Sequence, residues 1–406
     1  MMIVVQINFS CTWGSTGKIC DAVSQILTKG KIENYIFYIY GKNPDNKQNY
    51  LKYGNLPYTK FQALKSKISG AYGFHSSAST KWLIGKLEEI KPDIVHVHNI
   101  HGHDCHFEML FQYLKTKNIR VFYTFHDCWT FTGYCPHFSM AKCDHWLYGC
   151  GNCPLRKRYS WFFDRSAKNY NKKRMALSGL DMTIITPSEW LAKLVKQSFL
   201  KGYTVRVINN GIDLSVFKPT VGRFREEYNL QNKKIVLGVA MMWSIAKGLD
   251  VFVHLAKTLP NDYRIVLIGT NDSIDKFLPN NVISIHRTQN QQEMAEIYTA
   301  ADLFVNPTRE ENYPTVNMEA LACGTPVLTF RTGGSPEMLD ETCGSVVDCD
   351  DIDKLEKEII RICKEKPYSE GACLKKAKNF DKNDKFREYI ELYEGINITG
   401  IEENRV

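Results

Sequence analysis

Apolar and polar positions alternate along the chain in two ways that predict different elements. Short runs rich in Val, Ile, Leu and aromatic residues indicate buried strands, and the longer stretches between them carry apolar residues at helical spacing. Strands are predicted at 3–9, 35–41, 94–99, 121–126, 182–188 and 205–211, and a second series at 234–240, 263–269, 282–287, 303–308, 326–330 and 344–348. Each half is therefore predicted to be a doubly wound α/β domain built on a parallel sheet.

The predicted linker between the halves is the polar segment 214–234, which has no strand pattern. We expect an N-terminal domain at 1–213, a C-terminal domain at 214–379 and a final helix at 380–406 that crosses back to the N-terminal domain. A length of 406 residues allows two domains of about 200 residues each. The cleft between two such domains is the expected ligand site.

Composition indicates a folded protein without a membrane span. Hydrophobic residues make up 44% of the chain and charged residues 24%, a balance typical of globular domains. The N-terminus lacks the charged region of a signal peptide, and no stretch approaches the roughly 20 apolar residues that cross a bilayer. We therefore expect a cytoplasmic protein, at most peripheral to the inner face of the cell membrane.

Charge is unevenly spread along the chain. The net charge is +8, but residues 1–200 contain 26 Lys and Arg against 13 Asp and Glu, whereas residues 201–406 contain 26 against 31. The basic first half suits an anionic surface or acceptor, such as phosphate groups, acidic lipid or nucleic acid. A solvated basic face explains the same asymmetry.

The segment 306–339 carries the most informative pattern. It is predicted to run strand, loop, helix, turn, strand, loop and helix, with Pro314 before a helix at 315–323. Glu311 then lies in the loop at the carboxyl end of a strand, where open α/β sheets bind ligands, and Glu319 lies a turn into the helix. Two such carboxylates can accept hydrogen bonds from the vicinal hydroxyls of a ribose or a sugar. The alternative is a surface charge at Glu311 and a capping or ion-paired residue at Glu319.

Glycines and a lysine near strand ends supply candidate anion sites. Gly333 and Gly334 lie between a strand and a helix, where backbone N–H groups bind anions. Lys247 follows the first strand of the second half and could neutralise a leaving diphosphate. Gly14 and Gly17 follow the first strand of the chain, but their loop is too short for the ATP-binding pattern, so only a close backbone approach to a phosphate is expected. Ordinary loop geometry and an exposed helix lysine are the alternatives.

Histidines gather after two predicted strands. One strand ends in His96-Val97-His98-Asn99-Ile100-His101-Gly102-His103, and another ends in His126-Asp127. A histidine at the end of a buried strand can hydrogen-bond a sugar hydroxyl or exchange a proton near neutral pH. A metal cluster at 96–103 is a competing interpretation, which alternation along a strand disfavours because it separates the side chains.

These motifs resemble one family in content and order. The segment EENYPTVNMEALACGTPVL resembles the E-x7-E signature of family-4 retaining glycosyltransferases, with Glu311 and Glu319 at the two glutamates. The Gly14–Gly17 loop, His126-Asp127, Asn210-Gly211-Ile212-Asp213, Lys247-Gly248 and Gly333-Gly334 also follow in family order. The resemblance implies the GT-B fold, in which two Rossmann-like domains face each other across a cleft, the first binding the acceptor and the second the donor.

The resemblance also implies roles for individual residues. Glu319 would hold the donor ribose, Glu311 would contact the transferred sugar, and Lys247 would stabilise the diphosphate. His126 would contact the donor sugar or shield the intermediate. The further donor contacts expected are Gly14, Gly17, Asn312, Tyr313, Pro314, Thr315, Arg331, Gly333 and Gly334, and the expected acceptor contacts are His98, Asn99, His101 and Asp127.

One position departs from the family pattern. An arginine is expected a few residues before Lys247, but this chain has Met241-Met242-Trp243 there. Arg331 or another cation would then substitute, or the diphosphate would be stabilised by Lys247 and backbone N–H groups. A non-catalytic nucleotide-sugar-binding or zinc-stabilised scaffold of the same fold is therefore an alternative function. A phosphorylase would need a lysine for pyridoxal phosphate and a much longer chain.

The expected reaction follows from the resemblance. Enzymes of this kind keep the anomeric configuration and use no divalent metal for catalysis. The predicted donor is a UDP- or GDP-sugar, and the predicted acceptor is a glycan or a lipid-diphosphate-linked glycan of cell-surface polysaccharide biosynthesis.

Four of the 13 cysteines are clustered in a predicted insertion at 128–165: Cys135, Cys143, Cys150 and Cys153. Two cysteines followed by a Cys-x2-Cys pair suit a tetrahedral structural zinc. Reduced cysteines, disulfides and an iron–sulfur cluster are the alternatives. Similar glycosyltransferases resemble this chain in carrying such an insertion, which is expected to fold a loop over the acceptor side.

Basic and aromatic residues follow at 156–165, in the sequence RKRYSWFFDR. That composition suits a membrane interface, which a lipid-linked acceptor would need. Nucleic-acid binding predicts the same composition, but no nucleic-acid motif accompanies it. Packing of an aromatic helix on its own domain is the remaining interpretation.

Overall fold

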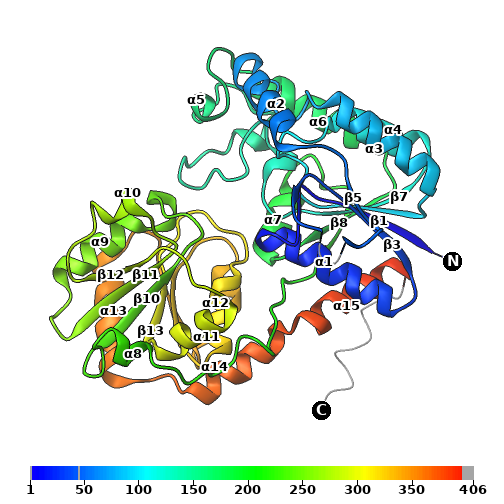
Figure 1. The fold of residues 1–406 in the computed structure, drawn as a ribbon. Helices are drawn as coiled ribbons and strands as arrows, with labels where there is room; N and C mark the ends of the chain where they lie inside the picture. Colours follow the sequence, from blue (N-terminus) through cyan, green and yellow to red (C-terminus); the bar gives the residue numbers. More distant parts are fainter. Residues whose placement is uncertain (1, 44–45, 396–406) are drawn as a thin grey trace. The chain divides into compact units, whose positions relative to one another are not determined.

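The computed structural model describes residues 2–43 and 46–395. It divides into two compact units, unit 1 with Met1–Asn209 and Asn383–Val406, and unit 2 with Asn210–Lys382 (Figure 1). Among the described residues, no helix combines the length and the apolar composition that a membrane span requires.

The chain passes between the units a few residues away from the predicted boundaries. The segment predicted as a linker, 214–234, belongs to unit 2, where it contains the helix α8 (Phe224–Glu227). Phe217, Phe224 and Leu230 are buried in the core of that unit. These three apolar side chains therefore attach a mostly polar segment to unit 2. The prediction missed them because it rested on the polar composition of the segment as a whole. Residues 396–406 of the predicted final helix lie outside the described residues.

A seven-stranded sheet forms the centre of unit 1, in the order β5-β3-β1-β6-β7-β8-β9. Every neighbouring pair is parallel. The five inner strands are mostly buried, as their continuous apolar sequences predict, whereas the edge strands β5 and β9 are largely half-buried or exposed. The strands are β1 (Ile3–Ile7), β3 (Glu33–Tyr38), β5 (Tyr50–Lys52), β6 (Ile94–Val97), β7 (Arg120–Thr124), β8 (Met182–Thr186) and β9 (Thr204–Val207).

Unit 2 is built on a six-stranded parallel sheet in the order β12-β11-β10-β13-β14-β15. Its strands are β10 (Lys234–Val239), β11 (Tyr263–Ile268), β12 (Val282–Ile285), β13 (Leu303–Asn306), β14 (Val327–Phe330) and β15 (Gly344–Val347). The prediction of two doubly wound domains is confirmed. It missed β5 and a two-stranded sheet of β2 (Ser10–Cys11) and β4 (Tyr40–Gly41), because these strands are too short to show a pattern.

Both sheets share the strand order of a Rossmann-like fold. Counted along the chain within each unit, the order is 3-2-1-4-5-6, with one strand added at the edge of unit 1. The order reverses between β1 and β6 in unit 1 and between β10 and β13 in unit 2. Loops diverge at such a switch point and leave a crevice at the carboxyl ends of the strands. The loops after these four strands are therefore where ligand sites are expected.

Helices connect the strands in each unit. In unit 1 they are α1 (Gly14–Lys29), α2 (Leu56–Ser69), α3 (Ser77–Ile90), α4 (Phe107–Thr116), α5 (Arg156–Tyr159), α6 (Ser166–Leu177) and α7 (Glu189–Gln197), with the 3-10 helices η2 (Trp129–Phe131) and η3 (His145–Leu147). In unit 2 they are α8, α9 (Leu249–Thr258), α10 (Asp272–Asp275), α11 (Gln291–Ala300), α12 (Thr315–Ala322), α13 (Ile352–Glu365) and α14 (Glu370–Ala377), with η4 (Ile245–Lys247), η5 (Ser335–Met338) and η6 (Lys378–Phe380).

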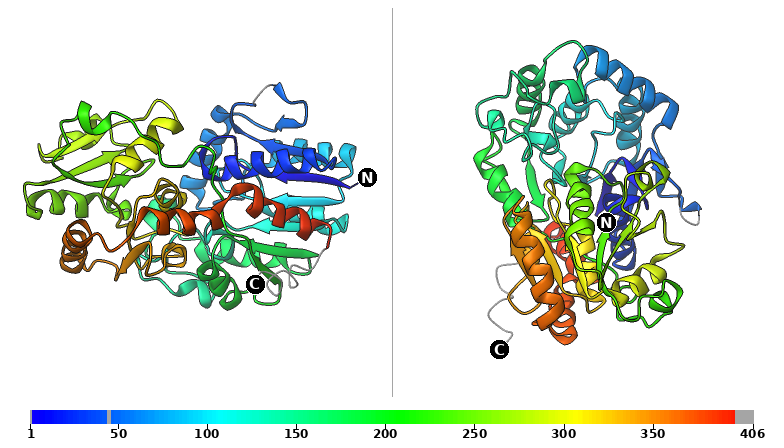
Figure 2. Two further views of the ribbon diagram at one scale, coloured as in Figure 1. Left: turned by 90° about the horizontal axis from the view of Figure 1, so that it is seen from below. Right: turned by 90° about the vertical axis from the view of Figure 1, so that its left-hand side faces the viewer.

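The last helix, α15 (Lys382–Tyr393), packs almost entirely on unit 1. Its residues Phe386, Tyr389 and Tyr393 share a buried cluster with side chains of α1, β1 and β6. Figures 1 and 2 show this helix, drawn in red, running beside α1, drawn in blue. The hydroxyl of Tyr393 is hydrogen-bonded to the buried His96, whose other ring nitrogen lies 2.8 Å from the Thr124 hydroxyl. Helix α15 thus covers part of one face of the first sheet.

Replacing Phe386 by alanine should destabilise unit 1, because the side chain is buried and its removal leaves a cavity. We expect a loss of about 3 kcal/mol, against less than about 0.5 kcal/mol for Arg387→Ala on the exposed side of the same helix. Six of the seven tryptophans lie in unit 1, so tryptophan fluorescence during unfolding reports mainly on that unit. Equal midpoints for the two variants would show that α15 is not part of the core of unit 1.

Candidate active site

An ion pair joins the two loops beside the switch point of unit 2. The Nζ atom of Lys247 lies 2.6 Å from Oε2 of Glu311, and both side chains are partly exposed. Lys247 ends η4 in the connection after β10, and Glu311 lies in the loop after β13. Because these strands are neighbours with crossovers to opposite faces, the fold brings together two residues that are 64 positions apart.

Arg309 holds the Lys247 turn in place. Its guanidinium binds both carboxylate oxygens of Asp250 at 2.8 Å and Oδ1 of Asp350 at 2.6 Å, and it also donates to the carbonyl of Ile245. The backbone N–H of Arg309 donates to the carbonyl of Ala246. Burial raises the pKa of Asp250, but the hydrogen bonds and charge of Arg309 outweigh that effect and lower it overall. The positive charge of Arg309 is therefore already paired with the carboxylates of Asp250 and Asp350.

Two glycines allow the loops of unit 2 to approach this closely. Gly248 has φ of +76°, and a Cβ atom there would collide with Pro307. Gly333 has φ of +57°, and a Cβ atom there would collide with the carbonyl oxygen of Glu311. Both positions combine a left-handed backbone with a close contact, so only glycine fits them without strain.

Glu319 lies on α12, a turn beyond the loop that carries Glu311. Pro314 caps this helix, Cys323 ends it, and Gly324 follows with φ of +83°, close to the predicted bounds. The hydroxyl of Tyr298 on α11 donates to Oε2 of Glu319 at 3.1 Å, which fixes the carboxylate. Burial and the Glu319 charge raise the pKa of Tyr298, so the hydroxyl stays protonated as a donor.

The predicted donor contacts at 312–315 form a buried to half-buried stretch between the two glutamates. The carbonyl of Tyr313 accepts a hydrogen bond from the Asn210 side chain at 3.2 Å. The backbone N–H of Asn312 donates to Oε1 of Glu311 at 3.1 Å. Pro314 and Thr315 form the start of α12. These contacts hold the loop rigidly around the glutamates, and a direct donor role for the four residues stays a prediction.

The glycine turn after β14 differs from its prediction. The N–H of Gly334 donates to the carbonyl of Asn312 at 2.7 Å, so it braces the loop of Glu311. The predicted helix behind the turn is only the four-residue 3-10 helix η5, in which Pro336 has no N–H to donate. Arg331 is 62% exposed and pairs with Asp348 at 2.8 Å, a surface contact. Donor binding by Arg331, Gly333 and Gly334 stays a prediction.

The predicted histidines of unit 1 line one small pocket at the carboxyl ends of β6 and β7. The rings of His98 and His126 are hydrogen-bonded at 3.2 Å, and Nε2 of His101 lies 2.8 Å from Oδ2 of Asp127. The pocket is lined by His98, Asn99, His101, Tyr123, Thr124, Phe125, His126, Asp127 and Thr130. All four predicted acceptor contacts and His126 are thus neighbours in the structure.

Burial sets the charge of this pocket. Desolvation lowers the pKa of His126 to about 4, against an opposing effect of Asp127, and lowers the pKa of His98 well below its usual value. Burial alone would raise the pKa of Asp127, but His101 and the N–H of Trp129 lower it to about 2. At neutral pH the pocket therefore contains neutral imidazoles at 98 and 126 beside one carboxylate.

The glycine loop at 14–17 lies beside this pocket. Gly14 starts α1 with φ of +69°, and a Cβ atom at Gly17 would lie 2.9 Å from the Ser10 hydroxyl and 3.1 Å from the backbone nitrogen of Thr12. Asn8 connects the loop to the pocket, because its amide donates to the Thr16 hydroxyl and its oxygen accepts from the N–H of Asn99. The backbone at Gly17 thus lies close to Ser10 and Thr12 of the same chain. Contact of this loop with a phosphate stays a prediction.

The insertion at 128–165 packs onto unit 1 next to the pocket. Trp129 is fully buried and its ring lies 5.1 Å from that of His101. Cys135, Cys143, Cys150 and Cys153 line one apolar cavity inside the insertion. No three of their sulfur atoms lie within 4.8 Å of one another, since the one such group in the described chain is Asp272, Asp275 and His286 in unit 2.

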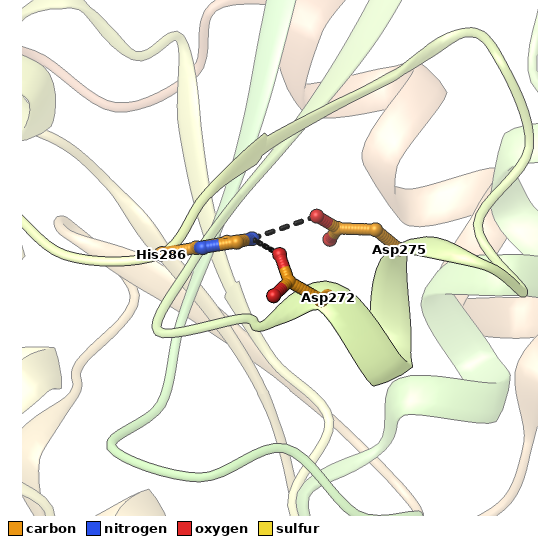
Figure 3. A group of neighbouring side chains, drawn as sticks. All are labelled: Asp272, Asp275 and His286. Atoms are coloured by element: carbon orange, nitrogen blue, oxygen red, sulfur yellow. Dashed lines mark hydrogen bonds and ion pairs between the residues drawn. The ribbon is translucent and has the colours of Figure 1, made fainter.

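That group is an exposed surface cluster. Figure 3 shows His286 directed at both carboxylates, with Nε2 2.7 Å from Asp275 and 3.9 Å from Asp272. The hydrogen bond that His286 donates to the Asp275 carboxylate raises the pKa of His286. The three side chains satisfy one another as ion pairs, and they lie outside the sites described above.

Comparison with known proteins identifies the family. Residues 60–216 match the model for Glycosyltransferase Family 4, and residues 221–386 match the model for Glycosyl transferases group 1. The chain belongs to glycosyltransferase family 4. The glycosyltransferase is 23% identical over 353 residues to WcaC of Escherichia coli strain K12, which is named for colanic acid biosynthesis, covering 82% of this chain and 84% of that protein.

Solved structures share the fold of this glycosyltransferase along its whole length. Sucrose-phosphate synthase of Thermosynechococcus elongatus has a TM-score of 0.71 at 15% identity, covering 98% of this chain and 99% of that one. Anabaena Alr3699/HepE in complex with UDP-glucose has a TM-score of 0.70 at 13% identity, covering 97% and 100%. The GT-B fold expected from the sequence is confirmed.

Sequence reasoning missed three residues that support the sites of the glycosyltransferase. Arg309 anchors the Lys247 turn, Tyr298 orients Glu319, and Asn8 links the glycine loop to the histidine pocket. Arg309 directly follows the predicted strand 303–308, as functional residues of open sheets do, and this position was the available signal. Asn8 lies inside the predicted strand 3–9 and follows the strand only in the structure, where β1 ends at Ile7. Tyr298 lies within a helix and gives no such signal.

The neutral state of His126 predicts a pH-dependent stability. Its folded pKa of about 4 lies below the unfolded value of 6.5, so the unfolded chain binds the proton first and stability falls as the pH drops from 6.5 toward 4. Between pH 7 and pH 5 this one residue should account for about 2 kcal/mol.

Thermal unfolding followed by tryptophan fluorescence at both pH values measures the effect. His126→Asn should reduce the loss of stability on acidification, whereas His254→Asn on α9 of unit 2 should leave it unchanged. An unaltered loss in His126→Asn would show that this imidazole is not held neutral.

Proposed function

We propose that the protein transfers a sugar from a nucleotide-sugar donor, UDP- or GDP-linked, to a glycan or lipid-diphosphate-linked acceptor in cell-surface polysaccharide biosynthesis. The observation that carries the proposal is the Lys247–Glu311 pair at the switch point of unit 2, with Glu319 on the following helix α12. The likeness to WcaC supports the pathway class, and the UDP-glucose held by HepE supports the donor class. We place the reaction in the cytoplasm, with the protein peripheral to the membrane.

Glu319 is the proposed ribose ligand. A carboxylate with two oxygens can accept hydrogen bonds from both ribose hydroxyls at once, and Tyr298 fixes its orientation. Because Glu319 lies on a helix whose ends are set by Pro314 and Gly324, its position is defined by the fold and not by a mobile loop. That rigidity reduces the entropy lost when the nucleotide binds.

Lys247 is the proposed counter-charge for the leaving diphosphate. A diphosphate carries more negative charge than the Glu311 carboxylate, so a bound donor would attract the ammonium away from its partner. Glu311 would then be released to accept hydrogen bonds from the transferred sugar. The ion pair thus keeps both side chains beside the proposed donor site before the donor binds. Because the upstream arginine is missing, Lys247 would be the main fixed cation near the diphosphate.

The histidine pocket of unit 1 is the proposed acceptor site. Neutral His98 and Asn99 can donate and accept hydrogen bonds to sugar hydroxyls, and the His101–Asp127 pair supplies a fixed carboxylate. With a pKa of about 4, His126 is a weak base at neutral pH. Its proposed role is to contact the donor sugar or shield the intermediate, and the departing phosphate takes the acceptor proton with retention of configuration and without a metal.

Nucleotide binding tests the donor assignment. Glu319→Ala should weaken binding of the preferred nucleoside diphosphate roughly tenfold to a hundredfold, as expected for the loss of hydrogen bonds to a charged group. Calorimetric titration with UDP and GDP measures the effect, and Glu365→Ala on the exposed surface of α13 serves as the control. Equal affinities of wild type and Glu319→Ala would refute the ribose assignment.

Turnover separates the enzyme from a binding scaffold. Wild-type protein with labelled nucleotide sugars should hydrolyse or transfer one of them in the presence of EDTA, and NMR of the product should show the anomeric configuration of the donor. Activity abolished by EDTA would contradict the metal-independent step. Binding without turnover of any donor would favour the non-catalytic scaffold.

We further propose that the four cysteines of the insertion hold a structural zinc ion. They surround one cavity, and the ammonium of the fully buried Lys173 lies against the same region, bound to the carbonyls of Trp129 and Thr132 at 2.6 and 3.0 Å. No carboxylate forms an ion pair with Lys173 in the described part of the chain. Burial lowers the pKa of Lys173 well below its usual value, and the net charge of −2 on a zinc with four thiolates would favour the charged form of this side chain.

Zinc binding would draw the sulfur atoms together, because Zn–S bonds of about 2.3 Å place sulfurs about 3.8 Å apart. Elemental analysis of the purified protein should find about one zinc per chain, and a chelator should lower the melting temperature of unit 1. Cys150→Ser should lose the metal, whereas Cys349→Ser in unit 2 should keep it. A metal-free protein with four titratable thiols, a disulfide, or iron with its visible absorbance would each contradict zinc.

A further inference from the structure

Helix α2 of unit 1 has its polarity reversed. The buried residues of this helix are polar, namely Thr59, Gln62 and Ser66. On the opposite face, Phe61 is 55% exposed, Leu64 45% and Ile68 44%. Residues at i, i+3 and i+7 share a helix face, so these three form one apolar stripe directed at solvent. A soluble helix normally shows the opposite pattern, so the stripe requires a partner.

A second apolar element continues this stripe. Trp161, Phe162 and Phe163, in the loop after α5, are all more than half exposed. The loop is attached to the end of α2, because the N–H of Trp161 donates to the carbonyl of Lys67 at 2.8 Å and the ammonium of Lys67 binds the carbonyl of Arg158. Figure 1 shows α2 and α5 next to each other in unit 1. We call the surface formed by 56–69 and 155–165 the α2–α5 face.

The loop is held in this exposed conformation by its own contacts. The guanidinium of Arg156 donates to the carbonyls of Trp161 and Phe162 at 3.2 Å each. Tyr134 accepts from the N–H of Arg165 at 2.7 Å. Three neighbouring aromatic side chains are thus presented outward from a fixed backbone, an arrangement that packing on their own unit does not explain.

The charge around the α2–α5 face has one sign. Its two segments contain seven Lys and Arg, namely Lys60, Lys65, Lys67, Arg156, Lys157, Arg158 and Arg165, against one acidic residue, Asp164. The oxygens of Asp164 already accept hydrogen bonds from the backbone N–H groups of Cys153 and Ser166. Lys60, Lys65, Lys157 and Arg158 are exposed.

We propose that the α2–α5 face docks on a bilayer that contains anionic lipid, with the apolar stripe and the aromatic loop entering the headgroup region and the surrounding cations binding lipid phosphates. Aromatic side chains flanked by lysine and arginine are the composition that membrane interfaces select. This inference deepens the proposed peripheral membrane contact: it adds α2 to the segment 156–165 and names the lipid charge. The face binds lipid whether or not the protein transfers sugar.

Vesicle sedimentation of the full-length protein tests the face. Wild type should bind vesicles of phosphatidylcholine with about 30% phosphatidylglycerol, and should bind pure phosphatidylcholine at least roughly tenfold more weakly. The triple variant Phe61→Gln, Leu64→Gln, Ile68→Gln and the double variant Trp161→Ser, Phe162→Ser should each reduce binding to anionic vesicles by roughly tenfold or more. The control Phe277→Glu changes an exposed aromatic side chain of unit 2 and should bind like wild type.

Other outcomes would overturn the proposal. Wild type that stays free of anionic vesicles, or variants that bind as wild type does, would show that the face does not dock on lipid. A wild-type dimer in sedimentation velocity that the triple variant dissociates would assign the face to a second copy of the chain.

Donor hydrolysis in solution keeps this test separate from the proposed function. The triple variant should hydrolyse the nucleotide sugar at the wild-type rate while losing its vesicle binding. Lipid binding by a protein that turns over no donor would contradict the function and leave the docking face standing.

Discussion

Lys247 and Glu311 form a 2.6 Å ion pair across the switch point of the second sheet, and the surrounding structure is arranged to make that contact possible. The reversal of strand order between β10 and β13 places their loops side by side. The lack of a Cβ atom at Gly248 lets these two loops approach, the lack of one at Gly333 lets the turn after β14 approach Glu311, and Arg309 fixes the turn before Lys247. The pair is only partly buried, so its contribution to stability is small, and its importance lies in positioning.

The proposed role of this pair is that Lys247 and Glu311 leave each other for the diphosphate and the sugar of the donor. In the proposed reaction, an ammonium that a carboxylate already holds in place would bind the diphosphate with little further loss of conformational freedom. Such preorganised charge, directed at the leaving group, is the stabilisation that the proposed metal-independent step would need. In unit 1, the histidine pocket presents neutral hydrogen-bonding groups, because burial keeps His98 and His126 uncharged at neutral pH.

The sequence predicted the architecture well because parallel strands buried on both faces leave continuous apolar runs, and all twelve predicted strands are present. It also placed Glu311 and Lys247 after strand ends and Glu319 in the helix that follows, where the chemistry of open sheets is expected. The partners of these residues could not be read in the same way, because the contacts of Arg309 with Asp250 and Asp350 depend on the fold. The linker at 214–234 was misplaced because the segment is polar in overall composition, although three of its apolar residues are buried in the core of unit 2.

The orientation of helix α2 also could not be predicted from the sequence. Its composition mixes apolar and basic residues without a strong pattern, and only the structure reveals that Thr59, Gln62 and Ser66 face inward while the apolar side chains face outward. Burial direction is a property of the tertiary fold, so sequence periodicity alone could not distinguish a core stripe from a docking stripe.

A crystal structure of the full-length protein with its nucleotide sugar would show directly whether Lys247 and Glu311 exchange partners. We expect the ribose hydroxyls on the Glu319 carboxylate, a diphosphate oxygen within hydrogen-bonding distance of Lys247 Nζ, and Glu311 turned from Lys247 to the sugar. A nucleotide bound away from Glu319, or a Lys247–Glu311 pair that remains closed beside a bound diphosphate, would contradict this expectation.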